Sequence, residues 1–235
     1  MSGFDGYVKS LLHFDGANGS TTFTDESGKS WTASGAVIST AQSVFGGASG
    51  YFDRSDDYIY TADADDWDVG SGDFTIDLRI RTSTEAYRMA VFSQMSSDGA
   101  TATQCYQLFV NSNATTGDNK GISAQLWTGT TRYAVTVADA IAQNTWYHIG
   151  LERYGNTFRL FKDGASIGSV DVTGVTVNNP ANPFVIGRWG SYNSLYYGGH
   201  IEEFRFSKGV ARYLGSDFTP PTSPYSRDVL GAIIF

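Results

Sequence analysis

The stretch that decides the fold is Gly199–Tyr213, GHIEEFRFSKGVARY, which runs on to the exit DFTPPTSPY at residues 217–225. Phe204 and Phe206 lie two residues apart with charged residues around them, a spacing typical of a strand with one buried side. The three prolines of the exit lack the backbone N–H that a sheet ladder needs. This part of the chain therefore predicts a last strand, a short loop and an extended exit.

Similar patterns recur along the rest of the chain. The clearest lies within residues 74–81, where apolar and polar residues alternate strictly, as in a half-buried antiparallel strand. Turn signals such as Gly155-Asn156 and Asp163-Gly164 separate further short apolar segments. The residues expected inside the core are Phe74, Ile76, Leu78, Ile149, Leu151, Leu160, Phe204 and Phe206. We predict an all-β protein, with residues 1–225 as one domain and residues 226–235 as an apolar extension.

Composition excludes several classes of function. The chain has 235 residues and a formal net charge of −8, which disfavours nucleic acid and anionic membrane surfaces as partners. No apolar run approaches the length of a spanning helix, and the first residues do not resemble a secretory signal. We therefore expect synthesis in a cytoplasm. Cys105, the single cysteine, is expected to be a buried and unreactive thiol.

Five segments together resemble a known domain family. They are Asp73–Ile76, Trp146–Arg153, Phe158–Gly164, Phe184–Gly187 and the closing stretch from residue 199. In this order they resemble laminin-G-like domains with the concanavalin-A-like lectin/glucanase jelly roll, over roughly residues 8–225. The similarity is greatest to versions found in virion proteins of tailed phages. It implies two antiparallel sheets packed face to face, and a lectin-like architecture without a fixed activity.

The carboxylates do not form a catalytic pattern. A retaining glycosidase needs two carboxyl groups roughly 5–5.5 Å apart. One hydrolase group with this type of sheet uses Glu-x-Asp-x-Glu on one strand, a spacing that no glutamate of this chain matches. Glu202 and Glu203 are adjacent, so on a regular strand their side chains face opposite ways. The sequence also contains no Gly-x-Ser-x-Gly elbow. We predict that the protein is not an enzyme.

A calcium site is the metal site that the resemblance implies. Strict alternation places Glu202 on the same face as Phe204 and Phe206, with Ile201 on the opposite face, so that a carboxylate points to the buried side. Pairing of the first and last strands, which is usual in this family, brings Asp15 close to Glu202. We expect these two residues to hold Ca²⁺, with Asp25 or Asp53 as further ligands. The alternative is that Glu202 pairs with an arginine such as Arg188 or accepts backbone N–H groups.

The loop 188–199 is rich in Tyr, Ser, Gly and Asn, as adaptable recognition loops are. Its candidate ligand-binding residues are Trp189, Tyr192, Tyr196 and Tyr197. These rings can also cover one end of the core or contact a neighbouring subunit, since aromatic residues are typical of protein interfaces. Both interpretations are open at this point.

The C-terminal extension supplies candidate interface residues, namely Val229, Leu230, Ile233, Ile234 and Phe235. They are too few for a membrane span and are expected to dock on another copy of the chain or on a capsid or tail protein. We predict a non-enzymatic structural or adhesive protein of a phage virion, either a capsid decoration or a head or tail fibre protein. The alternatives are a carbohydrate-binding module for host glycans and, less favoured, a glycoside hydrolase.

Overall fold

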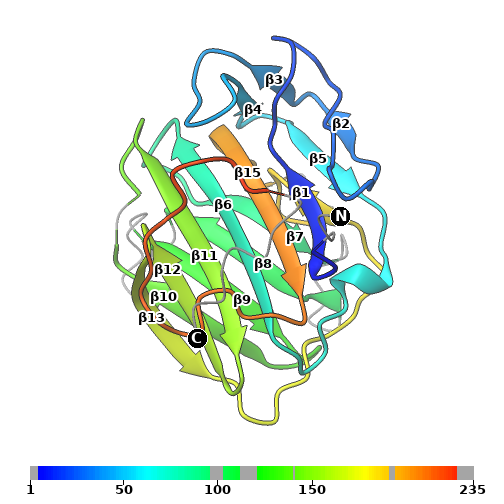
Figure 1. The fold of residues 1–235 in the computed structure, drawn as a ribbon, viewed down its shortest axis with the longest axis vertical. Helices are drawn as coiled ribbons and strands as arrows, with labels where there is room; N and C mark the ends of the chain where they lie inside the picture. The colour runs from blue at the N-terminus through cyan, green and yellow to red at the C-terminus, as the bar shows by residue number, and fades with distance from the viewer. Residues whose placement is uncertain (1–4, 96–102, 112–120, 140, 191–193, 227–235) are drawn as a thin grey trace.

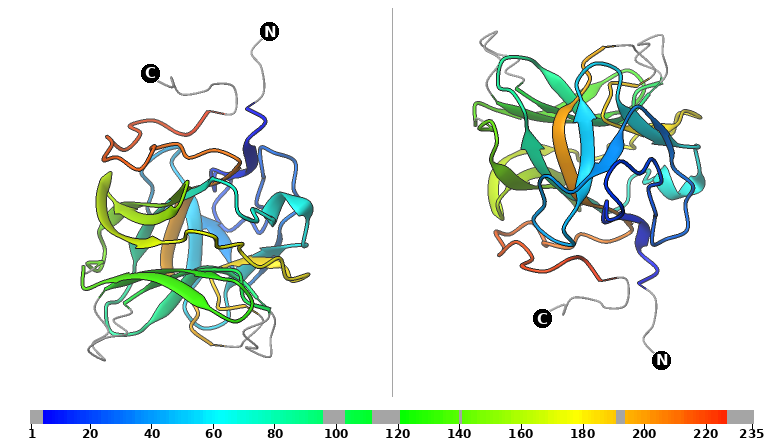
Figure 2. Two further views of the ribbon diagram at one scale, coloured as in Figure 1. Left: turned by 90° about the horizontal axis from the view of Figure 1, so that it is seen from below. Right: turned by 90° about the horizontal axis from the view of Figure 1, so that it is seen from above.

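The computed structural model describes residues 5–95, 103–111, 121–139, 141–190 and 194–226. Two antiparallel sheets pack face to face, with the chain crossing repeatedly between them (Figures 1 and 2). One turn of 3-10 helix, η1, spans Asp65–Trp67. No helix among those residues has the length and hydropathy of a membrane span. The predicted all-β sandwich is confirmed.

The first sheet has eight strands in the order β13-β12-β11-β6-β15-β4-β3, with β1 also paired to β15. Its strands are β1 Val8–Leu12, β3 Val37–Ser39, β4 Ser49–Asp53, β6 Phe74–Thr82, β11 Trp146–Tyr154, β12 Thr157–Lys162, β13 Ala165–Asp171 and β15 Gly198–Lys208. The second sheet has seven strands in the order β10-β9-β8-β7-β14-β5-β2. Its strands are β2 Thr32–Ser34, β5 Tyr58–Thr61, β7 Met89–Gln94, β8 Tyr106–Val110, β9 Ile122–Trp127, β10 Arg132–Val137 and β14 Phe184–Ile186.

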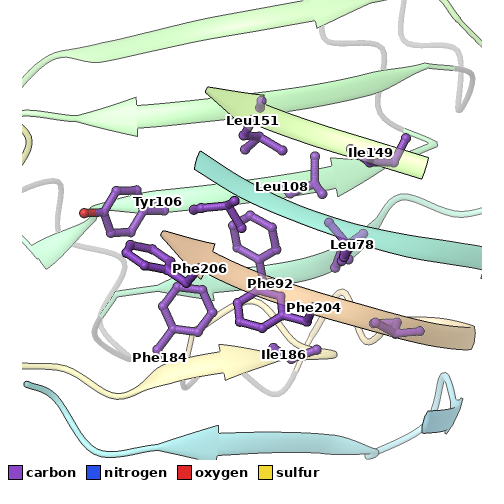
Figure 3. Close-up of a cluster of buried hydrophobic side chains, with 14 of the residues drawn as sticks. Leu78, Phe92, Tyr106, Leu108, Ile149, Leu151, Phe184, Ile186, Phe204 and Phe206 are labelled. Atoms are coloured by element: carbon purple, nitrogen blue, oxygen red, sulfur yellow. The ribbon is translucent and has the colours of Figure 1, made fainter. Parts of the chain in front are cut away.

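The core fills the space between the sheets and is strongly aromatic (Figure 3). All eight residues that the period-two pattern placed inside are buried. At the centre, the Phe184 ring stacks on Trp67 at a centroid distance of 4.8 Å and on Phe92 at 5.6 Å. Phe206 meets Phe184 edge-on at 6.0 Å. Offset and edge-on ring pairs add to the hydrophobic burial, so this cluster fixes how the two sheets face each other.

The predicted hairpin is present, with β11 and β12 joined at Gly155-Asn156. The next turn, at Asp163-Gly164, has positive φ at both residues (50° and 83°), as type I′ turns require. Gly164 has a second reason to lack a side chain, because a Cβ there would lie 1.9 Å from the carbonyl oxygen of Phe218. The exit segment after β15 therefore packs closely against this turn.

Strand β15 departs from the regular alternation at one point. Its register against β6 shifts between Glu202 and Arg205, and Glu203 has a left-handed φ of 55°. This β-bulge adds one residue, so Ile201 and Phe204 both point into the core. Before the bulge β15 pairs with β4, and after it β15 pairs with β1. The prediction that Ile201 faces away from the core was wrong, because alternation cannot be carried through a bulge.

Residues 209–225, which we call the C-terminal strap, cross the outer face of the eight-stranded sheet (Figure 1, orange to red). Figure 2 (left) shows this segment outside the two layers. Its backbone is held by carboxylates of the sheet: Glu152 accepts hydrogen bonds from Tyr213 N at 2.6 Å and Gly215 N at 2.7 Å. Arg79 donates to the Pro221 carbonyl. The exit pairs with no described strand, as the prolines predicted, and it covers one side of the sheet (Figure 1).

A buried polar network lies beneath the strap. Asp77, fully buried on β6, accepts two hydrogen bonds from Arg205 at 3.1 and 2.8 Å and one from Tyr213 Oη at 2.7 Å. The Tyr225 ring lies over the Arg205 guanidinium at 3.8 Å, and its hydroxyl is 2.8 Å from His148 Nε2. Burial lowers the pKa of His148 to about 4. The network thus requires a neutral histidine under the strap.

The depressed pKa of His148 leads to a pH-dependent stability. The contribution of neutral His148 to the stability of the fold is fully present above pH 6.5. This contribution is lost as the pH falls through 4. Between pH 7 and 4 the parent should lose about 3 kcal/mol more of its unfolding free energy than the His148→Gln variant loses. Urea denaturation at the two pH values measures this difference. A difference that does not change with pH would contradict the expectation.

His13 provides a control of opposite sign. Its hydrogen bond to Glu203 raises its pKa, so its contribution is present below pH 6.5 and is lost as the pH rises. The stability difference between the parent and His13→Gln is therefore expected to move in favour of the parent on acidification.

Candidate functional site

The first candidate site is the corner where β1 ends beside β15. Glu202 is buried and accepts hydrogen bonds from Val44 N at 2.6 Å and Phe45 N at 2.5 Å. Asp15, which is exposed, approaches the same loop, since a Cβ on Gly46 would lie 1.9 Å from its Oδ1. Asp15 and Glu202 therefore both contact loop 44–46. The predicted pairing of the first and last strands, which brings them together, is confirmed.

The bulge changes the predicted orientation of Glu202. Its carboxylate lies on the outer side with loop 44–45 and not on the core side with Phe204, so that prediction was wrong. Glu203 lies near it, and the prediction that the two glutamates face opposite ways does not hold for a bulged strand. Glu202 accepts backbone N–H groups, as in the alternative to a calcium site, and calcium binding at Glu202 stays a prediction. Arg188 instead stacks on Tyr58 at 3.7 Å.

The electrostatics of this corner favour a cation. Burial raises the pKa of Glu202 to about 7, and the nearby carboxylates of Glu203 and Asp15 contribute to that shift. Glu203 has its own partners, His13 Nδ1 at 2.6 Å and Tyr225 N at 2.6 Å. Among the described residues no lysine or arginine forms an ion pair with Asp15 or Glu202. Calcium takes roughly six to eight oxygen ligands, of which Asp15 and Glu202 would supply a part.

The further calcium ligands that the sequence suggested lie elsewhere. Asp25 is occupied by Ser10 Oγ, Trp31 Nε1 and backbone N–H groups. Asp53 belongs to a different group, in which one oxygen each of Asp53, Asp56 and Asp57 lie within 4.8 Å of one another. Asp57 accepts a hydrogen bond from Asp53 N, which closes this turn internally. The candidate calcium site is thus reduced to Asp15 and Glu202.

We propose that calcium binds at Asp15 and Glu202 and stabilises the native state by preferential binding. The melting temperature at pH 7.5 is then expected to rise with millimolar Ca²⁺ and to fall with EDTA. Asp15→Asn should abolish the response, because it removes one of the two carboxylate ligands. The variant should still fold, since Asp15 is exposed and its replacement leaves the core intact. Asp56→Asn is the matched control in the second acidic group and should keep the response. A melting temperature that neither calcium nor EDTA changes would rule the site out.

The second candidate site is the aromatic loop that follows β14. Trp189 is half-buried, with its ring 6.2 Å from Phe109 in an edge-on arrangement. Tyr196 is also half-buried. Tyr192 lies outside the described residues. Two of the four predicted ligand-binding residues are therefore partly exposed.

Tyr197 has a different place from the one predicted. It is fully buried, its ring packs edge-on against Phe52 at 6.0 Å, and its hydroxyl donates to the His200 carbonyl. Burial raises its pKa above the ordinary range of a tyrosine. Tyr197 is a core residue and offers no surface to a ligand. The Tyr-Tyr-Gly sequence did not reveal this, because the loop turns inward one residue before β15 begins.

A row of polar side chains on the outer face of the seven-stranded sheet was missed by the sequence analysis. Gln107 and Gln125 are paired across β8 and β9 and are both buried. Gln107 Nε2 donates to Gln104 Oε1 at 2.8 Å, and Gln125 Nε2 donates to Ser123 Oγ at 3.2 Å. The sequence does contain the pattern behind this row, because polar residues alternate with apolar ones in both strands. The meaning of that pattern depends on which strands pair, and that is not readable from either strand alone.

The buried carboxylates of the described residues all have structural partners. Seven Asp and Glu residues are buried, and each accepts at least one hydrogen bond from the protein. They are Asp5, Asp25, Asp57, Asp77, Glu152, Glu202 and Glu203. Cys105 is buried as predicted, and burial raises the pKa of its thiol far above the ordinary value, which disfavours a nucleophilic thiolate.

The sheets, the aromatic core and the long central hairpin define a lectin-like β-sandwich. A family profile described as the concanavalin A-like lectin/glucanases superfamily, Laminin_G_3, matches residues 53–211. The chain belongs to this family. A comparison with curated proteins gave no match.

Solved structures with the same fold are distant in sequence. Domain 4 of the arabinanase AbnA from Geobacillus stearothermophilus, in complex with arabinotriose, is 14% identical with a TM-score of 0.63, over 87% of this chain and 93% of that one. The binding domain of Paraclostridial Mosquitocidal Protein 1 is 13% identical with a TM-score of 0.64 over 87% of this chain. The botulinum neurotoxin serotype D ligand binding domain, in complex with N-acetylneuraminic acid, is 12% identical with a TM-score of 0.60 over 88%. The chain spans 49% of each toxin structure, and these similarities establish the fold alone.

Proposed function

We propose that this chain is a non-catalytic adhesive domain that binds carbohydrate and is carried on a phage virion. The observation that carries the non-catalytic part is that every buried carboxylate of the described residues accepts structural hydrogen bonds. A glycosidase needs a carboxyl pair that is available to the sugar, with one group as acid and the other as base or nucleophile. Carboxylates that hold loops and the C-terminal strap in place are not available in that way.

Carbohydrate binding is supported by the family and by its relatives. Two of the similar structures contain a sugar, arabinotriose in one and N-acetylneuraminic acid in the other. In this chain, the loop after β14 contains Trp189 and Tyr196, both of which are partly exposed. An accessible aromatic ring next to polar groups is the usual platform for the apolar face of a sugar.

The virion part of the proposal is supported by the sequence. The closing segment from Gly199 resembles versions of this domain in tailed-phage virion proteins, and residues 226–235 are markedly apolar. The predicted partners are a major capsid or tail protein and further copies of the chain. We place the protein on the particle as a capsid decoration or as a head or tail fibre protein, after synthesis in the host cytoplasm.

Glycan binding is tested with purified protein on a glycan array. We expect the parent to bind at least one class of glycan, and Trp189→Ala to weaken that binding at least tenfold because the stacking ring is lost. Tyr154→Ala, an exposed aromatic at the β11–β12 turn, is the matched control and should bind like the parent. Absence of binding, or equal binding by Trp189→Ala, would contradict the proposed role. Release of reducing ends from β-glucans would show a hydrolase instead.

Docking through the C-terminal extension is tested by truncation after Tyr225. The interface residues Val229, Leu230, Ile233, Ile234 and Phe235 lie outside the described residues, so their role stays a prediction. Tyr225, which bonds to Glu203 and His148, remains in the truncated chain. The shortened protein should therefore melt within about 2–4 °C of the parent. It should lose its oligomeric state or its attachment to the particle, as sedimentation and particle binding would show.

The opposite result would refute docking. If truncation lowers the stability of an isolated monomer and leaves assembly unchanged, the extension closes its own domain. Tyr225→Ala is the matched control, because it breaks the strap network while keeping residues 226–235. This variant should lose stability and, when folded, should still assemble.

A further inference from the structure

A row of four side chains crosses the outer face of the eight-stranded sheet at one end. Tyr51 on β4 is paired with His200 on β15, His200 with Arg81 on β6, and Arg81 with Trp146 on β11. We call Tyr51, His200, Arg81 and Trp146 the outer row. Because the four positions are in register on neighbouring strands, their side chains leave the sheet side by side. Figure 1 shows the four strands next to one another.

The rings of the outer row lean toward its centre. The Tyr51 ring lies 5.1 Å from the His200 ring, and the Trp146 ring lies 6.3 Å from it although a whole strand separates the two. Tyr51 is 37% exposed, and Trp146 and Arg81 are half-exposed. Two partly exposed aromatic residues therefore flank a half-exposed arginine and a histidine that is 6% exposed.

Arg81 differs from the equivalent arginine two residues earlier on the same strand. Arg79 lies over the Phe45 ring at 4.8 Å and donates to the Pro221 carbonyl, so the strap and loop 44–46 occupy it. The Arg81 side chain faces the same side and makes no hydrogen bond, ion pair or ring contact with any described residue. The strap contacts Arg79 through the Pro221 carbonyl, whereas no hydrogen bond or ring contact within the described chain joins the strap to the outer row. A half-buried guanidinium without a protein partner is a natural receptor for an anion.

The hydrogen bonds of His200 define what else the row can bind. Ser49 Oγ donates its single proton to the Gln42 carbonyl at 2.7 Å, so at the 2.9 Å contact with His200 the proton must be on Nδ1. His200 Nε2 is then the acceptor nitrogen. It makes no hydrogen bond within the described chain. The outer row thus offers a cationic donor, a neutral acceptor for a hydroxyl and two ring faces.

We infer that the outer row is a second carbohydrate site, separate from the loop after β14, and that it takes a sugar acid. The carboxylate of a uronic or similar acidic sugar would pair with Arg81, a ring hydroxyl would donate to His200 Nε2, and the apolar sugar face would rest on Trp146 or Tyr51. An acidic peptide satisfies Arg81 but brings no ring of hydroxyls to the histidine. The row would select acidic sugars although the whole chain carries a net charge of −8.

The test compares oligogalacturonate with its methyl ester, two probes that differ in charge and share the sugar ring. Titration calorimetry with the full chain should show binding of the acid at least tenfold tighter than of the ester. Binding should weaken as salt is raised, since an exposed charge pair is screened. Arg81→Gln should lose at least tenfold in affinity for the acid. Arg132→Gln, an exposed arginine on β10 of the other sheet, should bind like the parent.

Several outcomes would overturn the inference. They are equal binding of acid and ester, unchanged affinity in Arg81→Gln, tighter binding of oligoglutamate than of the sugar acid, and absence of binding by any probe at millimolar concentration. Trp146→Phe keeps a ring and should retain most of the affinity, whereas Trp146→Ala should not. Trp189→Ala should leave this binding unchanged, so failure of this site and failure of the loop site are distinguishable. Melting curves identify any variant that is unfolded.

Discussion

The bulge in β15 is the local feature on which most of this structure depends. At Glu202–Glu203 the strand gains one residue, and Glu203 takes a left-handed conformation that a residue other than glycine or asparagine rarely adopts. The strand changes partner there from β4 to β1. The surrounding structure stabilises the strained backbone, because Glu203 is bound to His13 on one side and to Tyr225 N on the other. One inserted residue thus connects the first strand, the last strand and the end of the strap.

The same bulge explains why two carboxylates are buried at the edge of an apolar sandwich. A regular strand would send Glu202 or Glu203 into the core, where an unpaired charge costs several kcal/mol. The bulge keeps Ile201 and Phe204 inside and turns both glutamates outward, where backbone N–H groups and a histidine satisfy them. Burial in this corner, together with the negative charges of Glu203 and Asp15, raises the pKa of Glu202. The calcium proposal follows from this geometry and not from the presence of acidic residues alone.

The sequence predicted what depends on local periodicity. Residues 74–81 and the hairpin around Gly155-Asn156 have the predicted structure, because alternation and turn residues act over a few positions. The predictions failed where a long-range contact decides the outcome. Alternation was extended through the β15 bulge to Glu202, and Tyr197 was assigned to a surface loop although Phe52 draws it into the core. The strap on the outer face was also missed, since its proline-rich sequence fixes an extended backbone but not the surface that it covers.

The outer row is a second feature that could not be predicted from the sequence. Arg79 and Arg81 look equivalent in the sequence, as two charged residues on the solvent face of one strand. Only the three-dimensional arrangement separates them, because the strap accepts a hydrogen bond from the guanidinium of Arg79 and not from that of Arg81. The sheet therefore has a covered part, where polar groups bind one another, and an open part, where a cation, an acceptor and two rings are left for something outside the chain. Fold similarity does not distinguish these two parts, since both belong to the same regular sheet, and the assignment of function to the open part rests on its unpaired groups.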